Sequence, residues 1–380
     1  MEKNAVMLDP IPFSEIPGWR EDDHLAAWKA FLSSCGAVLE SAPSHLKPAV
    51  AAAPSVLRDI CALALGEARS GTPQTRETAR RFFEAHFRPH RVRASSAQRL
   101  LTGYYEPLIK GSRERDATFQ VPIYKRPPDL VNVVAESERG ARSESFTHMR
   151  QTQHGLAPYL TRAEIEEGGL AGMGLELLYF KDPIEVFFMQ VQGSGRVELS
   201  DGQKVRVTYD GKNGYPYTSI GRVLIEEGEI RSEEISLKSL KQWLRRNPER
   251  AKTVMRKNQS YVFFRELTEN DAKGPIGANG IALHAGRSLA IDTMYYPLGM
   301  PIYVDAPEIT HATKKPGGFR RLLIAHDVGS AIKGTERGDI YFGSGDDAGR
   351  IAGRTKHPGR FIVLLPIKAA PDCAIMSVKP

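Results

Sequence analysis

The stretch PIEVFFMQVQGSGRVELSDGQKVRVTYDG, residues Pro183–Gly211, decides the class of fold. Its second half alternates apolar and polar residues, which is the period of a half-buried β-strand. The dipeptide Asp201-Gly202 interrupts that alternation and favours a tight hairpin turn. The whole stretch therefore predicts short strands joined by turns, with its clearest alternating positions at Val205, Val207 and Tyr209.

Short strands are also expected on both sides of this stretch. They begin with RLLTGYYEPLIKG and return in the last hundred residues with MPIYVDA, RLLIAHD and RFIVLLPIK, separated by glycine turns. No regular alternation of strands and helices is present, and no internal repeat is found. These absences argue against a doubly wound α/β fold.

The first ninety residues have a helical pattern instead. HLAAWKAFLSSCGAVLE places one apolar stripe on a helix, Pro54 can open a second helix, and Thr72-Pro73 has the form of an N-cap followed by a helix. A further short helix is expected after Thr161, which forms a capping box with Glu164. The sequence thus predicts a mainly β protein, made mostly of β-barrels, with N-terminal helices. The apolar stripe consists of Leu25, Trp28, Phe31, Leu32 and Cys35.

Length and composition restrict the class of protein. The 380 residues suffice for two domains, or for one domain with a large insertion. No apolar run approaches the roughly 18 residues that a membrane span needs. The N-terminal segment has no apolar run typical of a signal peptide, so both a cytosolic chain and a chain that starts after a removed signal remain open.

The formal net charge of +7 favours an anionic partner, which could be nucleic acid, a membrane surface or an acidic polymer such as cell-wall glycan. Basic residues cluster in Leu237–Asn258, where leucines at helical spacing predict an amphipathic helix with a solvated charged face. A nucleic-acid patch is the alternative, although no RNP, zinc-knuckle or KH signature accompanies the cluster.

The chain has three cysteines, too few for a disulfide scaffold and unsuited to a zinc site. Cys35 and Cys61 fall in separate expected helices, and Cys373 lies near the C-terminus. Buried free thiols are the simplest expectation. A Cys35–Cys61 bridge is expected only in an oxidising compartment.

Several familiar catalytic motifs are missing. The sequence contains no G-x-S-x-G elbow, no P-loop and no H-E-x-x-H. His86 and His90 are four residues apart, but Pro89 interrupts the helix that a metal pair at this spacing would need. The paired Asp-Thr-Gly or Asp-Ser-Gly motifs of a two-carboxylate protease are not found either.

The remaining chemical signal is a set of acids on glycine-rich loops with aromatic residues nearby. HDVGSAIKGTERGDIYFGSGDDAG, residues 326–349, holds four aspartates. Such loops are typical of surface turns, but they also hold catalytic acids in many enzymes. The neighbouring aromatics could stack on sugar rings or pack in a core: Tyr104, Tyr105, Tyr215, Tyr217, Tyr341 and Phe342.

Taken together and in order, the motifs resemble the membrane-bound lytic murein transglycosylase A family. They include LTGYYEP, PIYKRPP, FFMQVQGSGRV, YTSIGR, NQSYVFF, GRSLAID, PLGMPIYV and AHDVGSAIKGTERGDIYFGSG, and they span roughly residues 100 to 366. The resemblance implies a double-psi β-barrel domain built from residues 1–107, with the N-terminal helices, and 266–380. It also implies a smaller inserted β-barrel-like domain at residues 108–265, with peptidoglycan bound in a groove between the two.

The resemblance also implies the site residues. The catalytic acid of the DIY motif is Asp339, a second aspartate is Asp327, and a third in the GSGD turn is Asp346, beside Asp347. The substrate-binding residues would be Thr102, Tyr104, Gln192, Gly193 and Ser194.

The implied reaction cleaves the glycan with one aspartate as acid and then base, and it yields a 1,6-anhydromuramoyl end. It needs no metal and no cofactor. Peptidoglycan strands are the implied partner, and nucleic acid is not expected. The resemblance further implies a periplasmic location, with outer-membrane association and cell-wall enzyme complexes as expectations.

One feature departs from the family pattern. Family members commonly carry a lipid on a cysteine at the mature N-terminus, whereas the first cysteine here is Cys35, inside an expected helix. Two functions outside the enzyme class also remain open: a non-catalytic cell-wall-binding module and a nucleic-acid-binding protein.

Overall fold

The structure is a computed structural model that describes residues 6–40, 54–71, 75–93, 99–134, 146–267, 274–313, 316–367 and 375–376. The chain divides into two compact units. The first comprises residues 1–104, 276–343 and 355–380, and the second comprises 105–275 and 344–354. The second unit therefore includes a short segment from the C-terminal part of the chain, which the expected domain boundaries did not contain.

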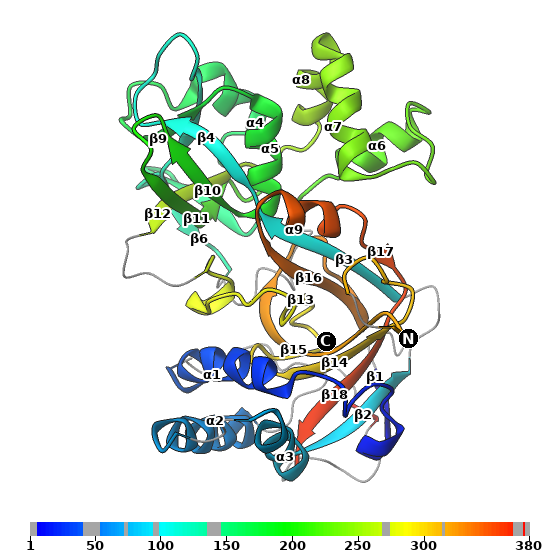
Figure 1. Ribbon diagram of the computed structural model, residues 1–380. Helices are drawn as coiled ribbons and strands as arrows, with labels where there is room; N and C mark the ends of the chain where they lie inside the picture. The colour runs from blue at the N-terminus through cyan, green and yellow to red at the C-terminus, as the bar shows by residue number, and fades with distance from the viewer. Residues whose placement is uncertain are drawn as a thin grey trace. The chain divides into compact units, whose positions relative to one another are not determined.

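The first unit is built on a ten-stranded sheet (Figure 1) with the order β17-β3-β16-β13-β15-β14-β18-β2-β1-β19. Its strands are β1 (Val6–Pro10), β2 (Phe87–Arg93), β3 (Arg99–Glu106), β13 (Ser288–Ile291), β14 (Pro301–Ala306), β15 (Phe319–Val328), β16 (Glu336–Ser344), β17 (Lys356–His357), β18 (Arg360–Pro366) and β19 (Ile375–Met376).

The central strands of this sheet are buried on both faces. Along β18, Ile362 and Leu364 pack toward one apolar cluster, while Val363 and Leu365 pack toward another. The second cluster also holds Leu101 of β3, although β3 is far from β18 and β2 in the strand order. A flat sheet could not bring these strands to one core, so the sheet curls around it. Closure into a double-psi barrel stays a prediction.

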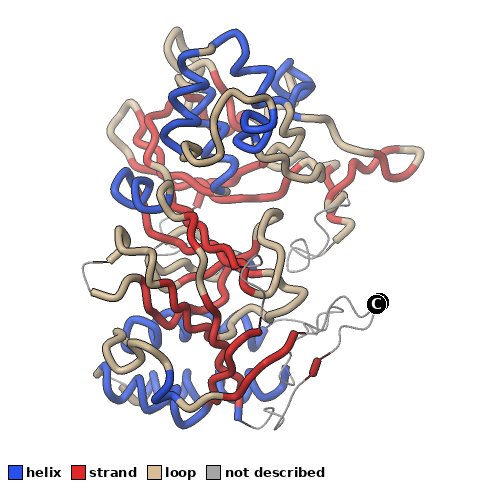
Figure 2. Tube along the Cα trace, turned by 90° about the vertical axis from the view of Figure 1, so that its right-hand side faces the viewer, coloured by secondary structure: helices blue, strands red, loops and turns tan. Residues whose placement is uncertain are grey.

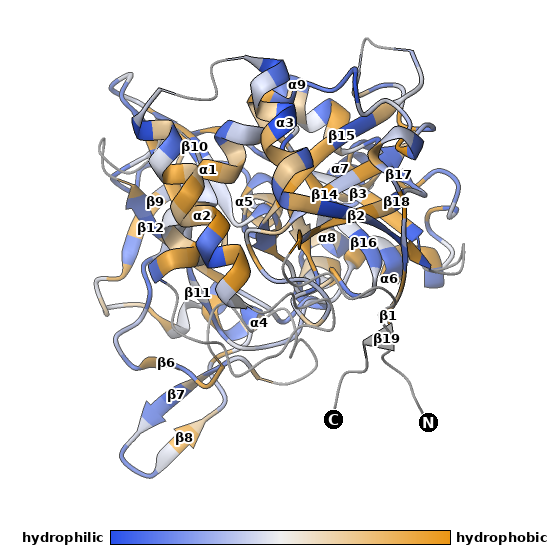
Figure 3. Cartoon of the chain, turned by 90° about the horizontal axis from the view of Figure 1, so that it is seen from below, coloured by the Kyte–Doolittle hydropathy of each residue, from blue (hydrophilic) through white to orange (hydrophobic). Residues whose placement is uncertain are grey.

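Three helices cover the other face of the sheet: α1 (His24–Glu40), α2 (Pro54–Arg69) and α3 (Arg76–His86). They lie together beside β14, β15 and β18 in Figure 1, and at the bottom of the turned view in Figure 2. The expected stripe of α1 is confirmed, because Trp28, Phe31 and Cys35 are buried in the cluster that these helices share with the sheet. Figure 3 shows the apolar colouring of α1 and α2.

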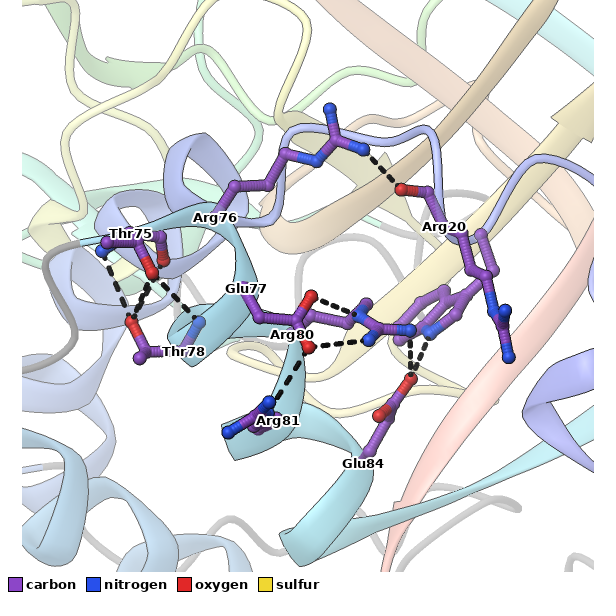
Figure 4. A network of polar contacts seen from close by, with 9 residues as sticks. Arg20, Thr75, Arg76, Glu77, Thr78, Arg80, Arg81 and Glu84 are labelled. Carbon is purple, nitrogen blue, oxygen red and sulfur yellow. Dashed lines mark hydrogen bonds and ion pairs between the residues drawn. The ribbon is translucent and has the colours of Figure 1, made fainter.

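The start of α3 differs from the expectation. Thr72 and Pro73 lie outside the described residues, and the N-cap is Thr75, whose side chain forms a reciprocal capping box with Thr78. Figure 4 shows this cap and the ion pairs that Glu77 makes with Arg80 and Arg81 one turn later. The capping hydroxyl satisfies an amide of the first turn that would otherwise have no partner.

Cys35 and Cys61 face each other across α1 and α2 as buried free thiols. A hydrogen bond between the two thiols and their burial raise the pKa of Cys35. The pair is therefore unbridged in the structure, although the two helices bring the sulfur atoms together.

The second unit has a six-stranded sheet of order β12-β11-β10-β4-β9-β5 and a three-stranded sheet of order β6-β7-β8. The three strands of the smaller sheet are labelled in Figure 3. The strands of this unit are β4 (Leu108–Ser112), β5 (Val121–Tyr124), β6 (Leu130–Asn132), β7 (His148–Thr152), β8 (Gly155–Ala157), β9 (Glu176–Phe180), β10 (Ser194–Leu199), β11 (Lys204–Lys212) and β12 (Val262–Leu267). Its helices are α4 (Arg162–Glu164), η4 (Ile165–Gly169), α5 (Pro183–Gln192), α6 (Ile220–Glu226), α7 (Leu237–Arg246), α8 (Pro248–Arg256) and α9 (Gly345–Ala352).

The stretch that opened the sequence analysis was predicted correctly only in its second half. Strands β10 and β11 form the hairpin expected around Asp201-Gly202. The first half is helix α5, so the expectation of strands there was wrong. Asp182 caps this helix, Pro183 is its first residue and Gly193 ends it in the left-handed conformation. These capping signals outweigh the β preference of the apolar residues between them.

Two other predictions concern the helices of this unit. The capping box of Thr161 and Glu164 at the start of α4 is confirmed. The basic segment is two helices rather than one, because Asn247 and Pro248 end α7 and start α8.

Candidate active site

Two of the three predicted acids, Asp327 and Asp339, lie on a common face of neighbouring strands in the first unit. The strands concerned are β3, β16, β13 and β15. Asp339 of β16 lies directly opposite Ala290 of β13, which lies opposite Asp327 of β15. Adjacent strands are about 4.8 Å apart, so the Cα atoms of the two aspartates are separated by roughly 10 Å. The residue between them, Ala290, is buried in an apolar cluster with Tyr104 and Tyr341.

A β-bulge turns Asp327 toward this face. The register between β13 and β15 steps from Leu289 opposite Ala325 to Ala290 opposite Asp327, which leaves His326 as the extra residue. Side chains alternate along a strand, so without the extra residue Asp327 would point to the other face. The bulged His326 is fully buried and its Nδ1 lies 2.7 Å from Ser288 Oγ, which ties the bulge to β13.

Asp339 has the environment expected of a proton donor. It is half-buried, and burial raises its pKa above the ordinary aspartate value. Two neighbours oppose this shift: the positive charge of Arg337, and the hydroxyl of Thr102, which donates a 2.6 Å hydrogen bond to Oδ1. The raised pKa thus comes from desolvation. Asp327, on the same face, is not among the groups that shift the pKa of Asp339.

Tyr104 is a buried neighbour of both acids. Its ring is 8% exposed, and it packs against Tyr341 at a centroid distance of 5.3 Å. Burial raises its pKa, and the negative charges of Asp327 and Asp339 raise it further. Of the two alternatives that the sequence left open for this ring, stacking on a sugar or packing in a core, its burial favours core packing. Its hydroxyl is the part of the side chain that faces the acids.

Gln192, Gly193 and Ser194 belong to the second unit and form one turn. Gln192 ends α5, and its Oε1 accepts a 3.0 Å hydrogen bond from the backbone amide of Tyr105. Gly193 has a φ of 77°, a conformation that favours glycine because it has no Cβ. Ser194 is buried at the start of β10.

Asp346 also belongs to the second unit, where it is exposed in the first turn of α9. Its neighbour Asp347 forms an ion pair with Arg350 on the same helix. Helix α9 is packed closely on Tyr105, since a Cβ at Gly349 would lie 2.8 Å from that ring. Of the three predicted acids, the structure therefore brings only Asp327 and Asp339 together within one unit.

The sequence reasoning missed Arg337, Ala290 and the bulge at His326. The position of Arg337 two residues before Asp339 on an expected strand was a usable signal, because side chains two apart share a face. The bulge has no such local signal. Within the described ranges, no group of three or more His, Cys, Asp or Glu side chains is arranged to hold a metal ion.

Comparisons with known proteins agree with this architecture. The chain matches the family model of the MltA specific insert domain over residues 100–265 and that of the 3D domain over residues 287–365. It is 35% identical over 273 residues to membrane-bound lytic murein transglycosylase A of Escherichia coli (strain K12). The aligned region covers 71% of this chain and 66% of that relative.

Two solved structures are similar over nearly the whole chain. The membrane-bound lytic murein transglycosylase from Agrobacterium tumefaciens has a TM-score of 0.86 at 34% identity, covering 96% of this chain and 99% of that one. MltA from Neisseria gonorrhoeae has a TM-score of 0.73 at 30% identity, and the match covers 100% of this chain and 95% of that one.

The class that these likenesses define is that of the lytic murein transglycosylases. Within that class, the chain belongs to the membrane-bound lytic murein transglycosylase A family.

Proposed function

We propose that the protein cleaves the β-1,4 bond between N-acetylmuramic acid and N-acetylglucosamine in peptidoglycan without water, leaving a 1,6-anhydromuramoyl end. The observation that carries this proposal is Asp339, a half-buried acid whose pKa is raised by burial, in a chain of the lytic transglycosylase A family. A raised pKa keeps an acid protonated for donation at a pH where an ordinary aspartate is ionised.

The proposed reaction uses Asp339 twice. Its carboxyl proton passes to the glycosidic oxygen as the C1–O bond breaks, and the N-acetylglucosamine 4-hydroxyl leaves. The resulting carboxylate then takes the proton of the muramoyl 6-hydroxyl while O6 bonds to C1. The second transfer restores the acid, so no water is consumed. An internal nucleophile replaces the second carboxylate that hydrolytic glycosidases use.

The neighbouring residues take supporting roles in this proposal. Thr102 donates to Asp339 and would hold the carboxylate orientation through both proton transfers. Asp327, on the same face, would stabilise positive charge that develops at C1. Asp346 is proposed as a third acid of the catalytic set. Tyr104 and the Gln192–Ser194 turn are assigned to substrate binding.

The broader setting is also proposed. We assign residues 108–265 as an inserted glycan-binding domain, and residues 1–107 and 266–380 as a catalytic domain of double-psi barrel type. The envelope is the expected location, because relatives are named membrane-bound. Within the described residues, no helix combines the length and the apolar character that crossing a bilayer requires. Outer-membrane association and cell-wall enzyme complexes belong to the same proposal.

Digestion of purified peptidoglycan sacculi tests the reaction. Mass spectrometry of the soluble fragments should find anhydromuramoyl ends, one water lighter than the reducing ends that a hydrolase leaves. Asp339→Asn should fold normally and lose most of the release, whereas Asp9→Asn, which removes a carboxylate from the same unit, should release fragments as the wild type does.

Other outcomes point to other functions. Mainly reducing ends would make the protein a muramidase. Binding to sacculi with no soluble product would indicate a binding module, and steeply salt-dependent binding to DNA or RNA would indicate a nucleic-acid protein. Near-normal turnover in Asp339→Asn would reject the assignment of the acid.

A further inference from the structure

Arg337 is the charged residue of the acidic face that the proposed reaction does not yet use. It lies two residues before Asp339 on β16, so the two side chains and that of Tyr341 project from the same face of the strand. The side chain is half-buried, and this burial lowers its pKa. Its Nη1 donates to the backbone carbonyls of Leu100, at 3.4 Å, and of Gly338.

The guanidinium has no carboxylate in direct contact. None of the ion pairs found among the described residues includes Arg337, and the negative charge that acts on it is that of Asp339. Burying a cation costs free energy unless it is paired or hydrogen-bonded. Two carbonyl acceptors offset part of that cost. Keeping an arginine here therefore calls for a reason beyond packing.

An arginine beside a general acid disfavours the protonated form of that acid, because a positive charge lowers the pKa of a carboxyl and lets it ionise at lower pH. The proposed reaction, however, needs both forms of Asp339 in one cycle. Burial stabilises the neutral form that donates the proton. The carboxylate that remains after donation must then survive in the same poorly solvated position until it takes the second proton.

We propose that Arg337 is a positioning residue for this reaction, which holds a positive charge beside Asp339 and stabilises the carboxylate formed between the two proton transfers. The inference rests on the proposed function. The carbonyls of Leu100 and Gly338 fix the guanidinium on two neighbouring strands, so its charge is present before the reaction begins. A preorganised charge costs no rearrangement when the carboxylate appears.

Several groups face the acid from the surrounding strands. Strand β3 contributes Thr102 and Tyr104, β16 contributes Arg337 and Tyr341, β15 contributes Asp327, and β13 contributes only Ala290. Two of these residues favour the ionised form of Asp339: Arg337 by its charge and Thr102 by its hydrogen bond.

The test compares Arg337→Gln with Arg337→Lys. The glutamine amide can still donate to the two carbonyls but carries no charge, while the lysine keeps the charge. Removing a nearby opposite charge should raise the pKa of Asp339 by about one unit or more. The alkaline limb of the kcat/KM profile on sacculi should move up by the same amount in Arg337→Gln and stay near the wild-type position in Arg337→Lys.

A second readout separates this inference from the proposed function. The pKa of the Asp339 carboxyl, measured by carbon NMR as the resonance that Asp339→Asn removes, should rise in Arg337→Gln whatever the reaction is. Arg360→Met is the control, since it removes one positive charge from the same unit. Arg360 is exposed, and its charge lowers the pKa of Glu336.

The outcomes are distinct. An unchanged carboxyl pKa in folded Arg337→Gln overturns the inference, and so does an equal shift in Arg337→Lys, which would assign the effect to geometry instead of charge. A shifted pKa without the matching shift of the activity profile would show that Arg337 acts on Asp339 but that Asp339 is not the acid. That result overturns the role proposed for Arg337 and the proposed function together. Normal turnover in Asp339→Asn, with the pKa shift intact, would reject the proposed function alone.

Discussion

Replacing Asp22 by asparagine should destabilise the first unit through a buried ion pair that supports the acidic face. Asp22 is 4% exposed and precedes α1. Its two carboxylate oxygens accept 2.8 Å bonds from Nη1 and Nη2 of Arg287, and one of them also accepts the backbone amide of Leu322 at 2.8 Å. Arg287 directly precedes β13 and Leu322 lies in β15, the strands that carry Ala290 and Asp327.

The expected loss of unfolding free energy depends on how many of these hydrogen bonds an asparagine at position 22 can still accept. The carboxylate accepts four bonds, since the backbone amide of Asp23 also donates to Oδ1 at 2.8 Å. The single carbonyl oxygen of asparagine can accept one or two of them, while its amide group points hydrogen atoms at a guanidinium that has lost its counter-charge. Removing one partner of a buried pair typically costs 3–5 kcal/mol. Because the substitution preserves shape and one acceptor, we expect about 3 kcal/mol for Asp22→Asn. Asp9→Asn breaks an exposed pair with Arg93 and should cost less than about 1 kcal/mol.

Urea unfolding followed by tryptophan fluorescence measures this cost. Of the three tryptophans, Trp19 and Trp28 lie in the first unit and Trp243 in the second, so a Trp243→Phe background reports on the first unit. An Arg287→Met variant and the double variant with Asp22→Asn complete a cycle. The double variant should cost much less than the sum of the single variants, because neither charge is then left buried alone.

The pH dependence gives an independent check. Burial works to raise the pKa of Asp22, but the charge and hydrogen bonds of Arg287 outweigh it, and the pKa lies below its ordinary value of 3.8. The folded state thus gains stability from this group above about pH 3.8 and loses it as the pH falls further. The gap between wild type and Asp22→Asn should narrow in that acid range. A cost below 1 kcal/mol, or a gap independent of pH, would refute the reasoning.

Two further predictions concern the acid and the cysteines. Thr102→Val removes the 2.6 Å hydrogen bond to Asp339 and should raise the pKa of this acid by about one unit. The alkaline limb of the pH–activity profile should then move to higher pH, while Thr102→Ser should match the wild type. An unmoved limb in folded Thr102→Val would contradict this. Mild oxidation should bridge Cys35 and Cys61, so that thiol titration of the unfolded protein falls from three groups to one, Cys373; three thiols after oxidation would show that the bridge does not close.

Several elements could be predicted from signals that lie close together in the sequence. The apolar stripe of α1, the capping box at Thr161 and the hairpin at Asp201-Gly202 each depend on residues within a few positions of one another. Helix α5 was not predicted although its signals were equally local, because the β preference of its apolar run conflicts with the capping signals of Asp182 and Gly193 at its ends. The ordered motifs carried the family, which the comparisons confirm.

The way in which the two acids come together depends on strand pairing and could not be predicted from the sequence. Asp327 and Asp339 share a face because His326 is one residue too many in β15, and an inserted residue reverses every side chain that follows it. No pattern along the chain reveals that bulge, since the register belongs to the pairing of two strands rather than to either strand alone. The same holds for the pKa of Asp339, which depends on burial, Arg337 and Thr102, brought together from separate strands.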